Sequence, residues 1–65
     1  MRILVNGEPV ATDARDLAEL CVTLGFTGAK VATALNGSFV ASAKRGLTPL
    51  APSDEVEIVA PRQGG

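Results

Sequence analysis

The sequence has no histidine, tyrosine or tryptophan and only one cysteine among its 65 residues. Without histidine, the commonest general base and metal ligand of proteins is missing. One cysteine and scattered carboxylates form neither a metal cluster nor an intrachain disulfide, so we expect a metal-free protein from a reducing compartment. A chain this short without a nucleophile–base pair is predicted not to be an enzyme on its own.

The chain also has no large excess of charge of one sign and no long apolar run. Six basic and seven acidic side chains give a formal net charge of -1, and no basic stretch is present. Nucleic acid is therefore not an expected partner. No apolar run is long enough to span a bilayer. The start Met1–Val5 is interrupted by Asn6-Gly7 too early for a secretory signal, so we expect a cytoplasmic protein that does not bind membranes.

Two Asn-Gly dipeptides, Asn6-Gly7 and Asn36-Gly37, separate short β-branched segments. Asn-Gly supplies the positive φ angles that a type I′ hairpin turn requires. Pro9 donates no amide hydrogen, so the strand after the first turn should begin at or after it, or lie at an edge. The pattern predicts two hairpins, with strands at residues 2–6, from Val10, at 31–35 and at 38–41.

One stripe of apolar residues has the spacing of a helix. Thr12 or Asp13 is predicted to cap its start, and Gly25 lies where a left-handed C-cap favours glycine. We predict a helix from Ala14 to Leu24, whose apolar stripe consists of Leu17, Leu20, Cys21 and Leu24.

The remaining segments complete an α+β pattern. Residues 26–30 form a connector with a break at Gly28, residues 42–53 a surface crossing with one short helical turn, and residues 56–60 a last strand that ends at Pro61. The economical arrangement is a β-grasp, or ubiquitin-like, fold: a mixed sheet of four to five strands with one main helix on one face. We expect a parallel pair between the strands that flank the helix. The predicted domain covers residues 1–60, followed by a flexible tail, 61–65.

Alternate residues of the strand at 31–35 face opposite sides of the sheet. We predict that Ala32 and Ala34 face the helix, because small side chains allow a close approach, and that the odd-numbered residues face the uncovered side. Leu35 and Val59 would then lie in an exposed apolar patch, and patches of this kind mark partner surfaces. These two residues are the predicted docking residues.

The tail ends in Gly64-Gly65. Two interpretations stay open on the residues alone. The tail is either a frayed terminus without function or an arm that enters a narrow cleft of another protein, since glycine has no Cβ to obstruct it. Five extended residues reach roughly 17 Å, enough to enter a cleft while the folded body docks outside.

Several segments combine into a family pattern that covers essentially the whole chain: Ala34-Leu35-Asn36-Gly37, the run 50–59 and the terminal Gly64-Gly65. In this combination the sequence resembles the ThiS family, small β-grasp sulfur carriers of thiamine (thiazole) biosynthesis. It departs from the family at Ser53-Asp54, where Gly-Asp is usual, and at 40–45, where the family often has Val-Pro-Arg and a downstream aromatic residue. These departures concern a loop and its contacts and leave the tail unchanged.

The resemblance implies a role for the tail. The carboxylate of Gly65 would be adenylated by a ThiF-type enzyme using ATP, and sulfur, ultimately from cysteine, would convert it to a thiocarboxylate. Gly64 and Gln63 would thread the partner's active site, and thiazole synthase would receive the sulfur. The carrier itself would need no cofactor, because the ATP is used by the partner enzyme.

Other functions remain as alternatives. A MoaD-like carrier for molybdopterin has a similar tail and fold, although the length and the Ala-Leu-Asn-Gly run favour the first assignment. A modifier conjugated to lysines is related. A noncovalent β-grasp binding module would use the open sheet face, with an inert tail. Deletion of Gly65 separates the carrier from the binding module, which should be indifferent to it.

The remaining reactive or charged residues have ordinary structural interpretations. Cys21 lies on the apolar stripe of the predicted helix and is interpreted as an inert core thiol rather than a persulfide relay. Asn36-Gly37-Ser38 matches a glycosylation sequon but is better explained as a hairpin turn. Phe26 and Phe39 are expected in the core or the patch. The others are interpreted as solvated or strand-edge charge: Lys30, Lys44, Arg45, Glu55 and Glu57.

Overall fold

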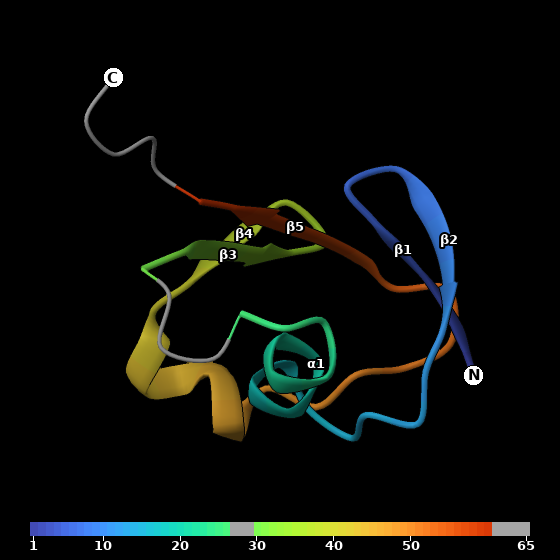
Figure 1. Cartoon of the computed structure of the whole chain (residues 1–65), viewed down its shortest axis with the longest axis horizontal. Coiled ribbons are helices and arrows are strands. Elements are labelled where there is room, and N and C mark those ends of the chain that lie inside the picture. Colours follow the sequence, from blue (N-terminus) through green and yellow to red (C-terminus); the bar gives the residue numbers. More distant parts are fainter. Residues whose placement is uncertain (27–29, 61–65) are drawn as a thin grey trace.

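The computed structural model describes residues 1–26 and 30–60. The expected break at Gly28 and the tail 61–65 lie outside the described residues. One sheet forms a layer, and the main helix packs against one of its faces (Figure 1). The elements in chain order are β1 (Arg2–Val5), β2 (Glu8–Ala11), α1 (Leu17–Thr23), β3 (Ala32–Leu35), β4 (Ser38–Val40), the 3-10 helix η1 (Ser42–Leu47) and β5 (Glu55–Val59).

The described strands form one mixed sheet in the order β2-β1-β5-β3-β4. The last strand in the sequence, β5, is central: it is parallel to β1 and antiparallel to β3. This is the β-grasp arrangement that the element order predicts. The prediction of a parallel pair between the strands flanking α1 is wrong, because those strands are β2 and β3 and the pair β1–β5 lies between them. Strand β2 begins before Pro9, and its edge position tolerates the missing N–H.

Both hairpin turns have the backbone that their sequence predicts. Asn6 and Gly7 have φ angles of 51° and 84°, and Asn36 and Gly37 have 50° and 85°. Positive φ at both central residues is the mark of a type I′ turn, which matches the twist of the flanking strands. The pairs Val5↔Glu8 and Leu35↔Ser38 close the two hairpins.

Helix α1 begins three residues later than predicted. Asp16, rather than Thr12 or Asp13, is its N-cap, and its carboxylate accepts a 2.8 Å hydrogen bond from the Glu19 amide. The earlier start is prevented by a pairing with a distant segment. Asp16 forms an isolated β-bridge with Pro49, and the Leu50 amide donates to the Arg15 carbonyl at 3.1 Å.

The end of α1 follows the prediction. Gly25 has a φ of 86°, and its amide donates to the Val22 carbonyl at 3.0 Å. The Phe26 amide donates to the Cys21 carbonyl at 2.9 Å. These two bonds form a Schellman motif, in which a left-handed residue, here Gly25, ends the helix.

The core lies between α1 and the covered face of the sheet. Leu17 and Leu20 are completely buried, and the neighbouring strands contribute Ile3, Val56 and Ile58. Each methylene removed from water in such a core contributes about 0.8 kcal/mol. The partly buried residues around this centre, which widen a thin core, are Val5, Val10, Leu24, Phe26, Val31, Leu35, Val40 and Leu50.

The predicted assignment of the faces of β3 is wrong. Thr33 is 1% exposed and pairs with the buried Ile58, so the odd-numbered residues face α1. Leu35 packs against the core from the same side. A threonine can occupy this position because its hydroxyl is satisfied: it donates to the Val40 carbonyl at 2.7 Å. Ala32 is exposed on the uncovered face.

The interpretation of Arg45 as solvated charge is also wrong. Arg45 lies in η1, and its Nε donates to the Thr33 hydroxyl at 2.9 Å while a terminal nitrogen donates to the Val31 carbonyl at 2.7 Å. The predicted short helical turn of the crossing is therefore present, and it is tied to β3. The guanidinium donors match this arrangement of two acceptors, which a lysine ammonium would meet less well.

Candidate functional site

Strand β5 carries the chain to the predicted reactive tail. It is paired on both sides, with β1 through Val56 and with β3 through Val59. The predicted tail residues Gln63, Gly64 and Gly65 lie outside the described residues. What the structure provides is the strand from which they continue, at the centre of the sheet rather than at an edge.

The uncovered face of the sheet bears an apolar patch near the end of β5. Phe39 and Val59 are 73% and 61% exposed. The strand register places Phe39 opposite Ala34 and Val59 opposite Ala32. We call these four residues the sheet-face patch. Val59 is exposed as the strand pattern indicates, but Leu35 is not part of the patch because it faces α1.

Two glutamates of β5 share this face with the patch. Glu57 pairs with Ala34, and Glu55 lies two residues earlier on the same side. Both are exposed. The uncovered face therefore places the Glu57 carboxylate beside the sheet-face patch, in the same cross-strand row as Ala34 and Phe39. Phe39 was expected in the core or the patch, and its exposure next to the inward Val40 decides for the patch.

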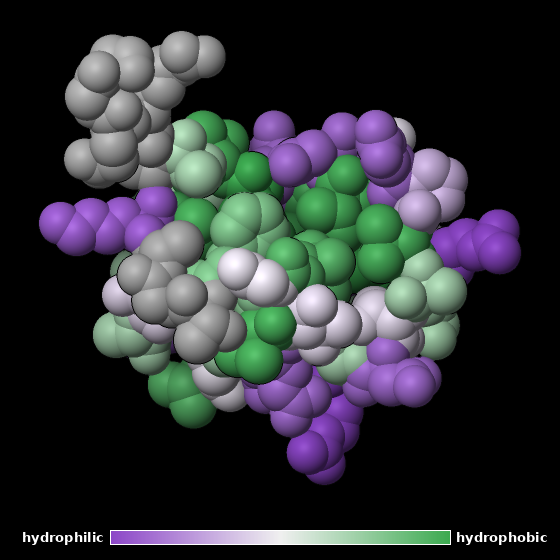
Figure 2. Space-filling model, in the orientation of Figure 1, coloured by the Kyte–Doolittle hydropathy of each residue, from purple (hydrophilic) through white to green (hydrophobic). Residues whose placement is uncertain are grey.

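Apolar surface is also visible between the two layers. Figure 2 shows it gathered across the middle of one side of the molecule, with hydrophilic side chains around the rim. A small domain leaves part of its apolar surface exposed because its layers are too short to close over one another. This side is thus distinct from the uncovered sheet face that carries the sheet-face patch.

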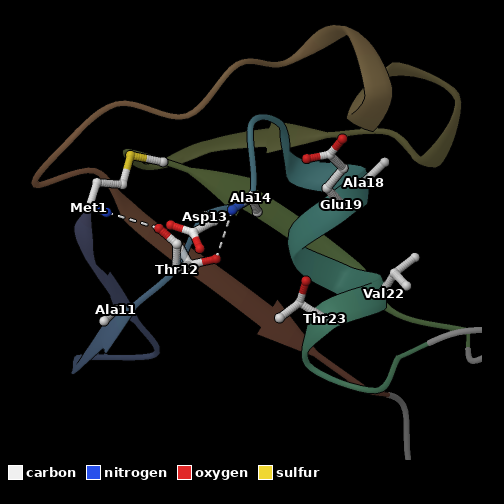
Figure 3. Close-up of a pocket in the computed structure, with 9 residues that line it drawn as sticks. All are labelled: Met1, Ala11, Thr12, Asp13, Ala14, Ala18, Glu19, Val22 and Thr23. Carbon is white, nitrogen blue, oxygen red and sulfur yellow. Dashed lines mark hydrogen bonds between the residues drawn. The ribbon is translucent and has the colours of Figure 1, made fainter.

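A wide, shallow groove of about 810 Å³ lies between the N-terminus and α1 (Figure 3). The Met1 ammonium donates to the Thr12 carbonyl at 2.9 Å, and the Thr12 hydroxyl accepts from the Ala14 amide at 3.0 Å. Asp13 and Glu19 place carboxylates at its rim. The Thr12 hydroxyl and the Glu19 carboxylate both accept hydrogen bonds from the segment that leads into α1, from Ala14 and Arg15 respectively.

Two ionisable groups of α1 have shifted pKa values. Hydrogen bonds from the Arg15 amide and guanidinium lower the pKa of Glu19, which forms a 3.2 Å ion pair with Arg15. Burial raises the pKa of the Cys21 thiol, opposed by the positive charge of Arg45. A buried neutral thiol is a poor nucleophile, which agrees with the interpretation of Cys21 as a core residue.

Within residues 1–26 and 30–60, no three metal-ligating side chains gather into a cluster. Over the same residues, no helix is both long and apolar enough to cross a membrane.

Comparisons with known proteins agree on one family. The model of the ThiS family matches residues 2–65. Among solved structures, the chain is similar to the crystal structure of a thiamine biosynthesis protein (ThiS) from Geobacter metallireducens, with a TM-score of 0.83 and 29% sequence identity over 100% of both chains. No curated protein sequence matches the chain.

These findings confirm the resemblance and the β-grasp fold. The family match extends over the hairpins, the helix, the central strand and the terminal glycines. ThiS proteins are small sulfur carriers of thiamine biosynthesis and not enzymes, and they act together with an adenylating enzyme and sulfur-transfer partners. The chain belongs to the ThiS family.

Proposed function

We propose that the carboxylate of Gly65 carries sulfur as a thiocarboxylate for thiazole formation. A carboxylate oxygen attacks the α-phosphorus of ATP, releases pyrophosphate and forms an acyl adenylate. A sulfide-level sulfur nucleophile then attacks the carbonyl carbon, forming the C–S bond as the C–O bond to AMP breaks. AMP is a good leaving group and oxide is not, which is why the adenylate must come first.

The observation that carries this proposal is the family match through Gly65, the last residue of the chain. Gly64 and Gly65 present no Cβ, so a narrow active site can close around the reacting carbonyl. Fully extended, the five residues 61–65 span roughly 17 Å. That length suffices to deliver the carboxylate into a cleft while the folded domain docks at its entrance.

The partners follow from the chemistry. A ThiF-type adenylyltransferase binds the ATP, so the carrier itself needs no ATP site. A donor system fed by cysteine supplies the sulfur. Thiazole synthase consumes the thiocarboxylate. Gln63 and Gly64 lie in the narrow entrance of these active sites while the folded domain stays outside. A thiocarboxylate persists best in a reducing environment, which favours the cytoplasm.

Docking is assigned to the sheet-face patch. Phe39 and Val59 are large apolar side chains that are more than half exposed, and the sheet register places them on the same uncovered face. Exposed apolar patches of this kind mark partner surfaces. The patch lies at the end of β5, so a partner that covers it lies next to the start of the tail. Glu57 gives the neighbouring surface a negative charge that favours a basic contact.

Deletion of Gly65 tests the carrier function. The deletion moves the terminal carboxylate back by about 3.4 Å, and a misplacement of even 1 Å can lower a rate about a hundredfold. We expect adenylation by a ThiF-type enzyme to fall at least that much, while binding to the enzyme and the melting temperature stay unchanged. A noncovalent binding module would show no functional loss, and that result would refute the proposal.

A further inference from the structure

The side chain of Asn6 binds the backbone of β5 through both of its polar atoms. Its Nδ2 donates to the Ile58 carbonyl at 3.0 Å, and its Oδ1 accepts from the Ile58 amide at 2.9 Å. The two residues are 52 positions apart in the sequence. A carboxamide that donates and accepts in this way reproduces the pair of bonds that a neighbouring strand would make.

Asn6 supplies this pairing where β1 can no longer do so. The parallel ladder contains a bond from the Leu4 amide to the Asp54 carbonyl at 2.9 Å and one from the Asn6 amide to the Val56 carbonyl at 2.8 Å. At Asn6 the chain turns away into the first hairpin with a φ of 51°. No further backbone of β1 reaches Ile58, and the Asn6 side chain extends the ladder by one step.

The second hairpin provides a matched residue at the opposite end of the same strand. Asn36 has a φ of 50°, and its Oδ1 accepts from the Glu55 amide at 2.9 Å. Its Nδ2 donates to the Asp54 carboxylate at 3.0 Å. Two asparagines in equivalent turns therefore bind the two ends of β5, and of the two it is Asn6 that binds the end leading to the tail, which β3 also pairs through Val59.

We propose that Asn6 is a positioning residue for the C-terminal tail, an inference that rests on the proposed carrier function. Ile58 lies three residues before Pro61. The bonds from Asn6 therefore hold the last part of β5, which includes Val59 of the sheet-face patch, next to the end of β1. Without them, Ile58 loses its partner on the β1 side, and the end of β5 is left to its pairing with β3. A strand end held from one side frays more easily, and a residue that frays must be ordered again when the tail enters a partner's active site.

The test is the variant Asn6→Gly, compared with Asn36→Gly. Glycine keeps the positive φ of each turn, so each variant removes the side-chain bonds without breaking the hairpin. Steady-state pyrophosphate release with a ThiF-type enzyme, ATP and the full-length carrier gives kcat and KM. We expect Asn6→Gly to lower kcat on the order of tenfold with little change in KM. Asn36→Gly should lose similar thermal stability and keep the wild-type kcat.

A third variant, Asn6→Asp, keeps the test decisive if Asn6→Gly does not fold. Asn6→Asp keeps the acceptor for the Ile58 amide and loses the donor to its carbonyl, so its kcat should lie between those of the wild type and Asn6→Gly. Hydrogen exchange provides a readout independent of the partner: the Ile58 amide should exchange faster in Asn6→Gly and not in Asn36→Gly.

The outcomes separate the two proposals. If the wild type is adenylated and the two glycine variants have the same kcat, Asn6 is a structural residue only and the inference is overturned. If the wild type is not adenylated by an enzyme that is active on its own carrier, the carrier function fails, and the role of Asn6 in tail delivery fails with it.

Discussion

Ser53 is the residue whose replacement should most clearly stabilise the fold. It has a φ of 72°, and the Asp54 amide donates to the Ala51 carbonyl at 3.1 Å. With Pro52 before it, this is a type II turn, whose third residue favours glycine. A side chain in the left-handed region costs about 1–2 kcal/mol. The ThiS family usually has glycine here, so Ser53→Gly restores a residue without that strain.

The gain is smaller than the strain removed, because glycine loses more backbone entropy on folding, about 0.4–1 kcal/mol. The net expectation for Ser53→Gly is a stabilisation of about 0.5–1 kcal/mol. For a domain of this size, that raises the melting temperature by about 2–8 °C. Thermal unfolding followed by circular dichroism measures it directly.

Ser38→Gly is the control. Ser38 is an exposed residue of β4 and has no positive φ, so glycine there should destabilise the protein, by about 0.5–1 kcal/mol. If Ser53→Gly lowers the melting temperature as Ser38→Gly does, the strain assigned to Ser53 is absent and the reasoning is refuted.

Three further predictions follow from other contacts. Arg45→Ala removes the hydrogen bonds to Thr33 and Val31 and should lower the free energy of unfolding, measured by chemical denaturation, by about 2 kcal/mol. Lys44 is exposed, so Lys44→Ala should change it little. Equal effects of the two substitutions would contradict the role of Arg45. Phe39→Ser should weaken binding to a ThiF-type enzyme about tenfold or more, with Leu47→Ser, 76% exposed in η1, as the control that keeps wild-type affinity. Burial raises the pKa of the Cys21 thiol, so above the ordinary thiol pKa the unfolded state loses a proton that the folded state keeps. The free energy of unfolding should therefore fall as the pH rises further, and Cys21→Ala should flatten this decline. An unchanged decline in the variant would show that Cys21 is not its source.

Local chemistry was enough to predict the hairpins and the end of the helix. Asn6-Gly7, Asn36-Gly37 and Gly25 adopt the positive φ angles for which these residues are suited. The start of α1 could not be predicted in this way, because a bridge from Asp16 to Pro49 holds the preceding residues extended. A contact between segments so far apart leaves no mark in the local pattern.

The errors on the sheet have the same origin. Thr33 looked like a surface residue, and its burial depends on the Val40 carbonyl and on Arg45, which approaches from η1. That choice of face moved Leu35 out of the predicted docking surface and brought Phe39 into it. The parallel pair β1–β5 joins the two ends of the domain, so only the assembled fold reveals it.

The candidate site also has one part that the sequence indicates and one part that depends on contacts between distant segments. The terminal glycines alone left two interpretations open, a frayed end or an arm that enters a narrow active site, and the resemblance to the ThiS family supplied the chemistry proposed for Gly65. The surface that accompanies them depends on which residues of β3, β4 and β5 share a face, and this required the register of the sheet.

The intact mass of the protein shows whether Gly65 carries sulfur. The full-length chain is incubated with ATP, an active ThiF-type enzyme and a sulfur donor, and the product is fragmented to locate the change. A sulfur carrier should gain the mass difference between sulfur and oxygen, confined to Gly65. An unchanged mass with a demonstrably active enzyme, or a gain located on Cys21 instead, would contradict it.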